Sequence, residues 1–180
     1  AAWFYAMRGV SLYMLFTIPL IFIVFNKRTD LALLFKIWAV LSILGTLKGI
    51  QQKVLGPDPW EQAWLDGGGS LTHVLFGKLR IFSFYSDAGQ FGGAQGYAGV
   101  VFGILALNQT KSFMLRLLYI VAAALGIYGM MISGTRGAIA VPFMGFALYV
   151  LLRKNIKVLT LGAIMGVVVF GFFKYTTIGN

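Results

Sequence analysis

The run Ser133-Gly134-Thr135-Arg136-Gly137 is the most unusual short feature of the chain, because it lies between two apolar stretches with almost no room for a loop. Ser133 or Thr135 can cap a helix that begins near Gly137, which places Arg136 at the positive end of that helix dipole. Free N–H groups, a glycine and an arginine at a helix start are suited to binding an anion. The alternative is an ordinary arginine that reaches lipid headgroups from a helix end.

A second polar run, residues 78–92, leads directly into another apolar stretch and carries Lys78, Arg80, Ser83 and Asp87. If its first residues are extended, Lys78 and Arg80 project to the same face; if they are helical, the two side chains diverge. Two or three cations near a bilayer surface can clamp a diphosphate, because a guanidinium pairs with two phosphate oxygens at once. The alternative for Arg80 is an ordinary interfacial cation.

Two further residues are weaker candidates. His73 is the only histidine, and it can act as a general base only with a partner that the sequence does not reveal, so a structural role is the alternative. Lys36 lies inside an apolar stretch, where a cation is costly and therefore points to function, unless it reaches the membrane surface or faces a helix that this part of the protein lacks. The sequence has no cysteine, no phosphate loop of the G-x-x-x-x-G-K-[ST] type and no cluster with metal-ligand spacing, so we expect no metal and no cofactor.

The composition indicates the elements that must position these residues. Of the 180 residues, 59% are hydrophobic and only 11% are charged, whereas a soluble domain averages about 45–50% and about 25%. This excludes a disordered tail and argues against an ordinary soluble globule. The formal charge of +10 would suit nucleic acid, but the basic residues lie at the ends of apolar stretches, which is typical of a membrane protein and predicts no nucleic-acid partner.

The apolar stretches predict an all-α, polytopic membrane helix bundle with about six transmembrane helices, since a helix needs about 20 residues to span a bilayer. Glycine pairs four residues apart, Gly92/Gly96 and Gly99/Gly103, predict close helix packing in the third stretch. The chain starts with Ala and ends without a polar tail, so we expect a single membrane domain cut from a longer protein. The expected spans are about 9–25, 31–50, 92–107, 113–133, 138–152 and 158–173.

Short basic loops at 26–30, 108–112 and 153–157 predict that this side of the bundle faces the cytoplasm. Segment 51–91 and the turn at 134–137 would then face outward. Trp60 and Trp64 in this segment are four residues apart, which gives them one helix face. Interfacial anchoring and sugar stacking are the two interpretations of this pair.

Both polar runs resemble motifs of the O-antigen ligase and O-antigen polymerase family of bacterial membrane glycosyltransferases. Arg80, Ser83 and the run Asp87-Ala88-Gly89-Gln90-Phe91-Gly92 are similar to an arginine that precedes a small polar turn entering a membrane helix. Residues 133–137 are similar to the family's Ser-x-Ser-Arg-Gly-like turn. The resemblance covers roughly residues 70–175. Ala88-Gly89 stands where Pro-Asn is common in the family, which leaves ligase versus polymerase open.

The resemblance implies an enzyme of lipopolysaccharide or other cell-envelope polysaccharide biosynthesis at the periplasmic face of the bacterial inner membrane. It would transfer a glycan from an undecaprenyl-diphosphate carrier to a lipid A-core or glycan acceptor, among membrane lipids and without a metal. Arg80 and Arg136 would be its catalytic residues, which hold the leaving diphosphate. Substrate binding would fall to Lys78, Ser83, Asp87, Ser133 and Thr135.

The family's proposed base is a histidine in a periplasmic loop that would lie beyond residue 180, so the resemblance does not give that role to His73. We therefore expect this part of the protein to be inactive alone. A polytopic membrane transporter, with Lys36 lining a path, and a structural membrane subunit are the alternative functions.

Overall fold

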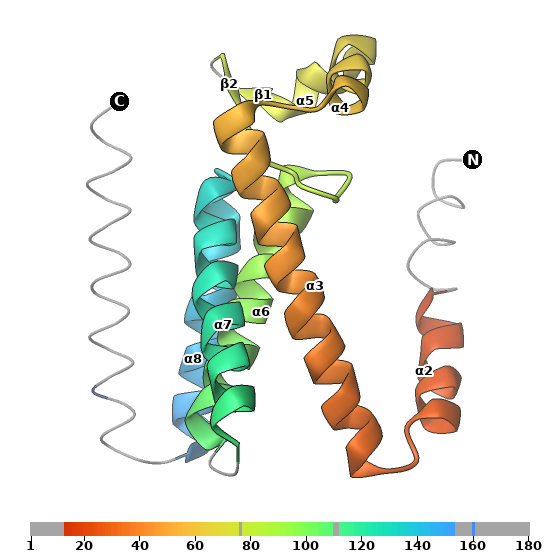
Figure 1. Ribbon diagram of the computed structural model, residues 1–180, viewed down its shortest axis with the longest axis vertical. Helices are drawn as coiled ribbons and strands as arrows, with labels where there is room; N and C mark the ends of the chain where they lie inside the picture. The colour runs from red at the N-terminus through yellow and green to blue at the C-terminus, as the bar shows by residue number, and fades with distance from the viewer. Residues whose placement is uncertain (1–12, 76, 110–111, 154–159, 161–180) are drawn as a thin grey trace. The chain divides into compact units, whose positions relative to one another are not determined.

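The computed structural model describes residues 13–75, 77–109, 112–153 and 160, and most of them are helical (Figure 1). Their contacts divide the chain into two units, Ala1–Trp38 and Ala39–Asn180. Every residue of the two polar runs belongs to the second unit.

The first unit contains α2 (Tyr13–Val24) and the start of α3 (Arg28–Leu55). The Asp30 carboxylate accepts backbone N–H bonds from Asn26 at 3.2 Å and from Lys27 at 2.9 Å. These bonds close the turn between the helices and place an acidic group in the first turn of α3, where it complements the helix dipole.

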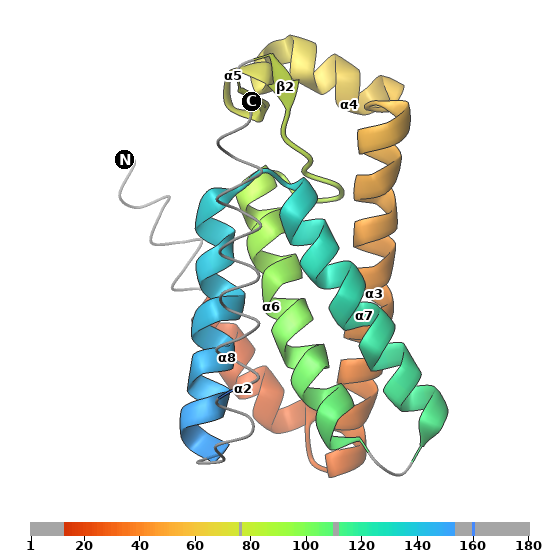
Figure 2. The ribbon, with the colours of Figure 1, turned by 90° about the vertical axis from the view of Figure 1, so that its left-hand side faces the viewer.

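The second unit is a helical bundle in which α6 (Ala88–Asn108) lies against α7 (Phe113–Ile132) and α8 (Ala140–Arg153) (Figure 2). The backbones of α6 and α7 approach closely at Gly126. A Cβ atom there would lie 2.8 Å from the Gln95 carbonyl oxygen and 2.9 Å from the Gly99 nitrogen. Only a residue without a side chain fits this crossing, as expected for small residues at a helix interface.

A polar layer fixes α3 against this bundle. The Ser42 hydroxyl donates to Gln95 Oε1 at 2.7 Å, and Gln95 Nε2 donates back to the Ser42 carbonyl at 3.2 Å. One turn further, the Thr46 hydroxyl donates to the Leu125 carbonyl at 3.1 Å. Ser42, Thr46 and Gln95 are all buried, so these bonds satisfy groups that would otherwise be costly and fix the rotation of α3.

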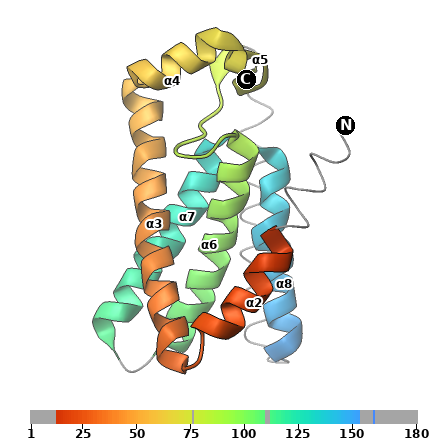
Figure 3. The same cartoon turned by 90° about the vertical axis from the view of Figure 1, so that its right-hand side faces the viewer.

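The segment between α3 and α6 folds into short elements at the end of α3, above the start of α6 (Figure 3). Asp58 begins α4 with a capping box: its carboxylate accepts from the Trp60 and Glu61 nitrogens, and the Glu61 carboxylate accepts from the Asp58 nitrogen. The elements are α4 (Pro59–Trp64), a π-helical turn (Leu65–Gly69), α5 (Ser70–His73) and the antiparallel strands β1 (Val74–Leu75) and β2 (Lys78–Leu79).

The prediction of about six transmembrane helices is wrong. Of the residues that the structure describes, only α3 and α7 form helices long and apolar enough to cross a membrane, and they correspond to the stretches 31–50 and 113–133. The stretch 92–107 lies in α6, whose glycines and glutamines make it too polar although it has 21 residues. Within the described ranges, α2 and α8 have only 12 and 14 residues. The stretch 158–173 lies outside the described residues apart from Thr160.

Candidate functional site

The two polar runs meet through Arg80 and Thr135. Arg80 Nη2 donates to the Thr135 hydroxyl at 2.8 Å, and that hydroxyl donates in turn to the Ala88 carbonyl at 3.1 Å. The Ala88 carbonyl belongs to the first turn of α6. The contact therefore joins the segment before α6, the start of α6 and the turn after α7 at one end of the bundle.

Arg80 is half-buried, and its Nε atom is fully buried without a hydrogen-bond partner in the part of the chain that is described. A buried donor left unpaired costs about 1–3 kcal/mol. A guanidinium has five N–H donors and no acceptor, and Thr135 accepts from only one nitrogen, Nη2, so Arg80 retains further donors. These features make Arg80 the centre of the candidate site.

The turn after α7 is organised by Ser133. Its buried hydroxyl donates to the Met130 carbonyl at 2.7 Å and accepts the Thr135 N–H at 3.2 Å. Gly134 between them has φ +66°, a left-handed conformation that glycine adopts without strain. Ser133 thus caps the end of α7 and sets the backbone of Thr135.

Thr135 stands at the first position before a 3-10 turn, Arg136–Ile139, that leads into α8, but its side chain makes no capping bond. The predicted capping of the next helix by Ser133 or Thr135 is therefore wrong. Both hydroxyls have other partners: Ser133 bonds within the turn, and Thr135 bonds Arg80 and Ala88.

Lys78 and Arg136 are the two exposed cations of the polar runs. Neither side chain makes a hydrogen bond or an ion pair with the residues that the structure describes. Lys78 lies in the extended strand β2, and the Arg80 N–H donates across the hairpin to the His73 carbonyl at 2.8 Å. The backbone is thus extended at β2, but the same-face placement expected of the extended alternative is not observed, because Lys78 is open to solvent whereas Arg80 is half-buried and donates to Thr135.

Asp87 and Ser83 have structural partners. Asp87 caps α6, since its Oδ1 accepts from the Gly89 nitrogen at 2.6 Å and from the Gln90 nitrogen at 3.1 Å. The buried Ser83 hydroxyl donates to the Gly45 carbonyl at 2.6 Å. Both residues shape the loop between Arg80 and α6, and substrate binding by either remains a prediction.

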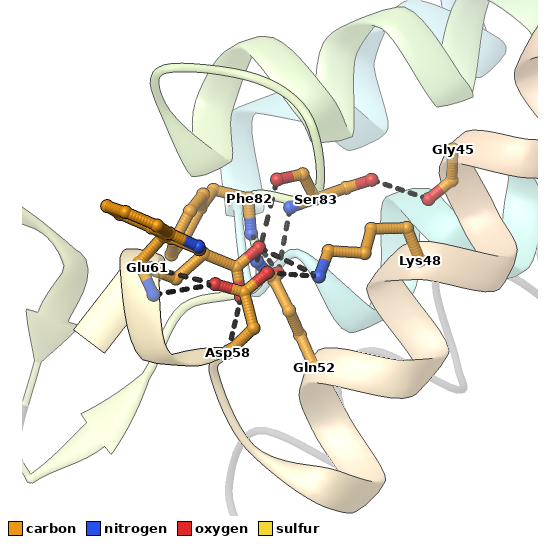
Figure 4. A network of polar contacts seen from close by, with 8 residues as sticks. Gly45, Lys48, Gln52, Asp58, Glu61, Phe82 and Ser83 are labelled. Carbon is orange, nitrogen blue, oxygen red and sulfur yellow. Dashed lines mark hydrogen bonds and ion pairs between the residues drawn. The ribbon is translucent and has the colours of Figure 1, made fainter. Parts of the chain in front are cut away.

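A polar network at the end of α3 was not predicted from the sequence (Figure 4). Lys48 Nζ lies 3.0 Å from the carboxylates of both Asp58 and Glu61, and Gln52 connects Glu61 to Ser83. The signals that could have found it are Lys48 and Gln52, one turn apart at the end of an apolar helix, and the capping-box spacing of Asp58 and Glu61. Hydrogen bonding from the Glu61 N–H, followed by the Lys48 ammonium, lowers the pKa of the Asp58 carboxyl.

His73 lies beside this network in aromatic surroundings. Its ring is 3% exposed and meets Trp64 and Phe82 edge-on, with centroids 4.7 Å and 5.1 Å away. Nδ1 lies 3.1 Å from the Gly69 carbonyl, while Nε2 is buried without a partner among the described residues. No carboxylate contacts the ring there, so these surroundings favour a packing role.

The described residues contain no group of His, Cys, Asp and Glu that could hold a metal ion. Lys36 is exposed on α3 in the first unit. Comparison of the chain with protein-family models, with curated proteins and with solved structures finds no match. Function is therefore inferred from the residues of the site.

Proposed function

We propose that this chain is the diphosphate-binding part of a membrane glycosyltransferase of the O-antigen ligase or polymerase type. The observation that supports the proposal best is the hydrogen bond from Arg80 to Thr135, which unites the two motifs of the resemblance across 55 positions of sequence. A chance similarity of two short motifs would give no reason for their central residues to touch.

The substrate would be a glycan on an undecaprenyl-diphosphate carrier. An acceptor hydroxyl, on lipid A-core or on another glycan, attacks the anomeric carbon, and the bond from that carbon to the diphosphate oxygen breaks. The electron pair leaves with the diphosphate, and the hydroxyl proton goes to a base outside the described residues. Negative charge grows on the leaving diphosphate, so preorganised donors there stabilise the transition state.

Arg80 suits this task because it is half-buried and already oriented by Thr135. A charge acts more strongly where water is partly excluded, and a guanidinium can grip two phosphate oxygens. Arg136 belongs to the same turn as Thr135 and is exposed, as a second cation for the diphosphate must be. Lys78 would add a third positive charge.

The enzyme would lie in the bacterial inner membrane with this site on the periplasmic side. The lengths and compositions of α3 and α7 support a membrane location. The outward assignment of segment 51–91 and of the turn at 134–137 follows from the short basic loops on the other side.

The proposal is tested with Arg80→Ala and Arg136→Ala in the full-length protein, by measuring glycan transfer in cells and with a purified polyprenyl-diphosphate glycan. Both variants should lose transfer while their amounts in the membrane stay normal. Arg→Lys at either position should also be impaired, because lysine cannot pair bidentately. Arg116→Ala, which removes an exposed arginine from α7, is the matched control and should keep activity. Wild-type surface polysaccharide in both alanine variants would refute the proposal.

A further inference from the structure

The face of α3 toward residues 81–83 is built to receive that segment closely. A Cβ atom on Gly49 would lie 3.2 Å from Ile81 Cγ2, so the absence of a side chain lets Ile81 pack onto the helix. One turn earlier, the Gly45 carbonyl accepts the Ser83 hydroxyl at 2.6 Å. Gly45, Gly49 and Gln52 follow one another at spacings of four and three, which places them on one helix face.

Gln52 is the residue of this face that binds the backbone of Phe82 and Ser83 (Figure 4). Its Oε1 accepts the Ser83 N–H at 2.8 Å and the Phe82 N–H at 3.3 Å. Its Nε2 donates to Glu61 Oε1 at 2.8 Å. The Gln52 side chain is only 2% exposed, so removing either function would leave buried groups unpaired.

These hydrogen bonds hold the backbone of Ser83 in an unusual conformation. Ser83 has φ +55°, the only positive φ among the described residues other than glycine. A left-handed conformation costs a residue with a side chain about 1–2 kcal/mol. Such a conformation persists only where the surroundings enforce it, and here the bonds from Gln52 and Gly45 do so.

Arg80 lies between the segment that Gln52 binds and the hairpin formed by β1 and β2. On one side, its N–H donates to the His73 carbonyl and continues the hairpin. On the other, a single residue, the buried Ile81, separates it from the Phe82 N–H that Gln52 binds. The backbone of Arg80 is therefore fixed on both sides, and its side chain is directed to Thr135.

Glu61 keeps the Gln52 amide in the required orientation. Glu61 can only accept when ionised, so Gln52 must turn its NH₂ group toward Glu61 and its oxygen toward Phe82 and Ser83. Lys48 holds Glu61 in place at 3.0 Å. A chain of contacts thus runs from Lys48 through Glu61 and Gln52 to the segment that carries Arg80.

We propose that Gln52 is a positioning residue, which sets Arg80 for the leaving diphosphate by holding the backbone of Phe82 and Ser83. The inference rests on the proposed function, because it gives Arg80 its role in transfer. Gln52 contacts neither Arg80 nor Arg136, and in this proposal it touches no substrate.

The first experiment replaces Gln52 by Met in the full-length protein, which keeps the length of the side chain and removes its hydrogen bonds. Hydrogen–deuterium exchange of the peptide around residues 80–87 should increase, and kcat for transfer from a polyprenyl-diphosphate glycan should fall by about 100-fold, the scale of a small misplacement. Gln51→Met is the matched control, since Gln51 is adjacent in α3 and makes no side-chain hydrogen bond with described residues. It should change neither readout.

The second experiment exchanges the two partners, which a merely structural loss would not repair. Gln52→Glu alone places two carboxylates 2.8 Å apart and should lower kcat. Glu61→Gln alone leaves Gln52 facing an amide that can point either way and should lower kcat less. The double variant Q52E/E61Q restores one donor and one acceptor at this contact, and kcat should recover at least tenfold relative to Gln52→Glu.

The outcomes separate the two claims. If Arg80→Ala abolishes transfer but Gln52→Met leaves kcat unchanged, the positioning role is overturned and the proposed function stands. If the exchange of the partners restores nothing, the role of Gln52 is general stability, and the inference is likewise overturned. If Arg80→Ala retains full transfer, the proposed function fails and the inference fails with it.

Discussion

The guanidinium of Arg80 donates a 2.8 Å hydrogen bond to the hydroxyl of Thr135, although 55 positions separate the two residues in the chain. The contact gives Thr135 a role that a helix cap would not have, because its second bond, to the Ala88 carbonyl, ties the arginine to the start of α6. The site thus depends on three segments being held together by one hydroxyl group.

Thr135→Val should therefore weaken transfer while the turn keeps its shape. Valine has the same branching but no hydroxyl, so Arg80 Nη2 and the Ala88 carbonyl both lose a partner. A hydrogen bond to a charged group contributes about 1.5–3 kcal/mol, which predicts roughly a 10- to 100-fold loss in kcat/KM. Thr135→Ser keeps the hydroxyl and should retain most activity. Equal activity of the Val and Ser variants would contradict the role of the bond.

The Asp58 carboxyl predicts how stability depends on pH. Its pKa is lowered in the folded protein by the Glu61 N–H and then by Lys48, so the folded state favours the ionised form. This contribution is complete above about pH 4, where aspartate ordinarily titrates, and is lost as the pH falls through the lower folded pKa. Asp58→Asn keeps a good helix cap but removes the charge.

The measurement is the thermal unfolding midpoint of the protein in detergent micelles between pH 7 and pH 3. Asp58→Asn should be less stable than the wild type at pH 7, and the difference should shrink toward pH 3. Asp66→Asn removes an exposed carboxylate that pairs with Gln62 and serves as the control. A difference that stays constant over the whole range would rule out the proposed contribution of Asp58.

The apolar stretches located α3 and α7 because a long apolar helix is visible in composition alone. They did not show where α3 ends, since Lys48 and Gln52 continue the helix to Leu55 with partners that lie outside it. The predicted number of membrane spans is too high partly because of α6. Its glycines and glutamines lower its hydropathy, and Gln95 is buried only because Ser42 satisfies it.

The candidate site was partly visible for a similar reason. Arg80 and Thr135 stand out by residue type next to apolar stretches, but their contact depends on how α6 and α7 pack. The position of Gln52, one turn after Lys48, signals a polar network but does not identify its partner, because Ser83 is 31 positions away. A glutamine in an apolar helix is informative only when the backbone groups that it binds are known.

Glycine positions on α6 and α7 predict different responses to alanine. At Gly126 a Cβ atom would meet the backbone of Gln95 and Gly99 within 3 Å, and backbone atoms cannot move aside. Gly126→Ala should lower the free energy of unfolding by about 1–3 kcal/mol, as overpacking does. Gly103 has open space around its Cβ position, so Gly103→Ala should be neutral or stabilising by up to about 1 kcal/mol.

Chemical or thermal denaturation of both variants in the same detergent checks this difference. Gly103 also belongs to a pair, Gly99/Gly103, that the four-residue spacing assigned to helix packing. Only Gly99 is in such a contact, against Ile127. If Gly103→Ala proved as destabilising as Gly126→Ala, the packing of α6 against α7 would differ from the one described.

The proposed orientation in the membrane can be tested cleanly because the sequence has no cysteine. Asn108 and Gly137 flank α7, are exposed, and are separated by a helix of 20 residues, or roughly 30 Å at 1.5 Å per residue. In intact spheroplasts, a membrane-impermeant maleimide should label Gly137→Cys. It should label Asn108→Cys only after the membrane is permeabilised.

Each cysteine variant should first be shown to transfer glycan, so that labelling reports on the native arrangement. Gly137→Cys is suited to this, since nothing lies within 4 Å of its Cβ position. Labelling of both positions from the same side would mean that α7 does not cross the membrane. Labelling of Asn108→Cys alone in intact spheroplasts would reverse the orientation and place Arg80 and Thr135 on the cytoplasmic side, where a periplasmic transferase could not use them.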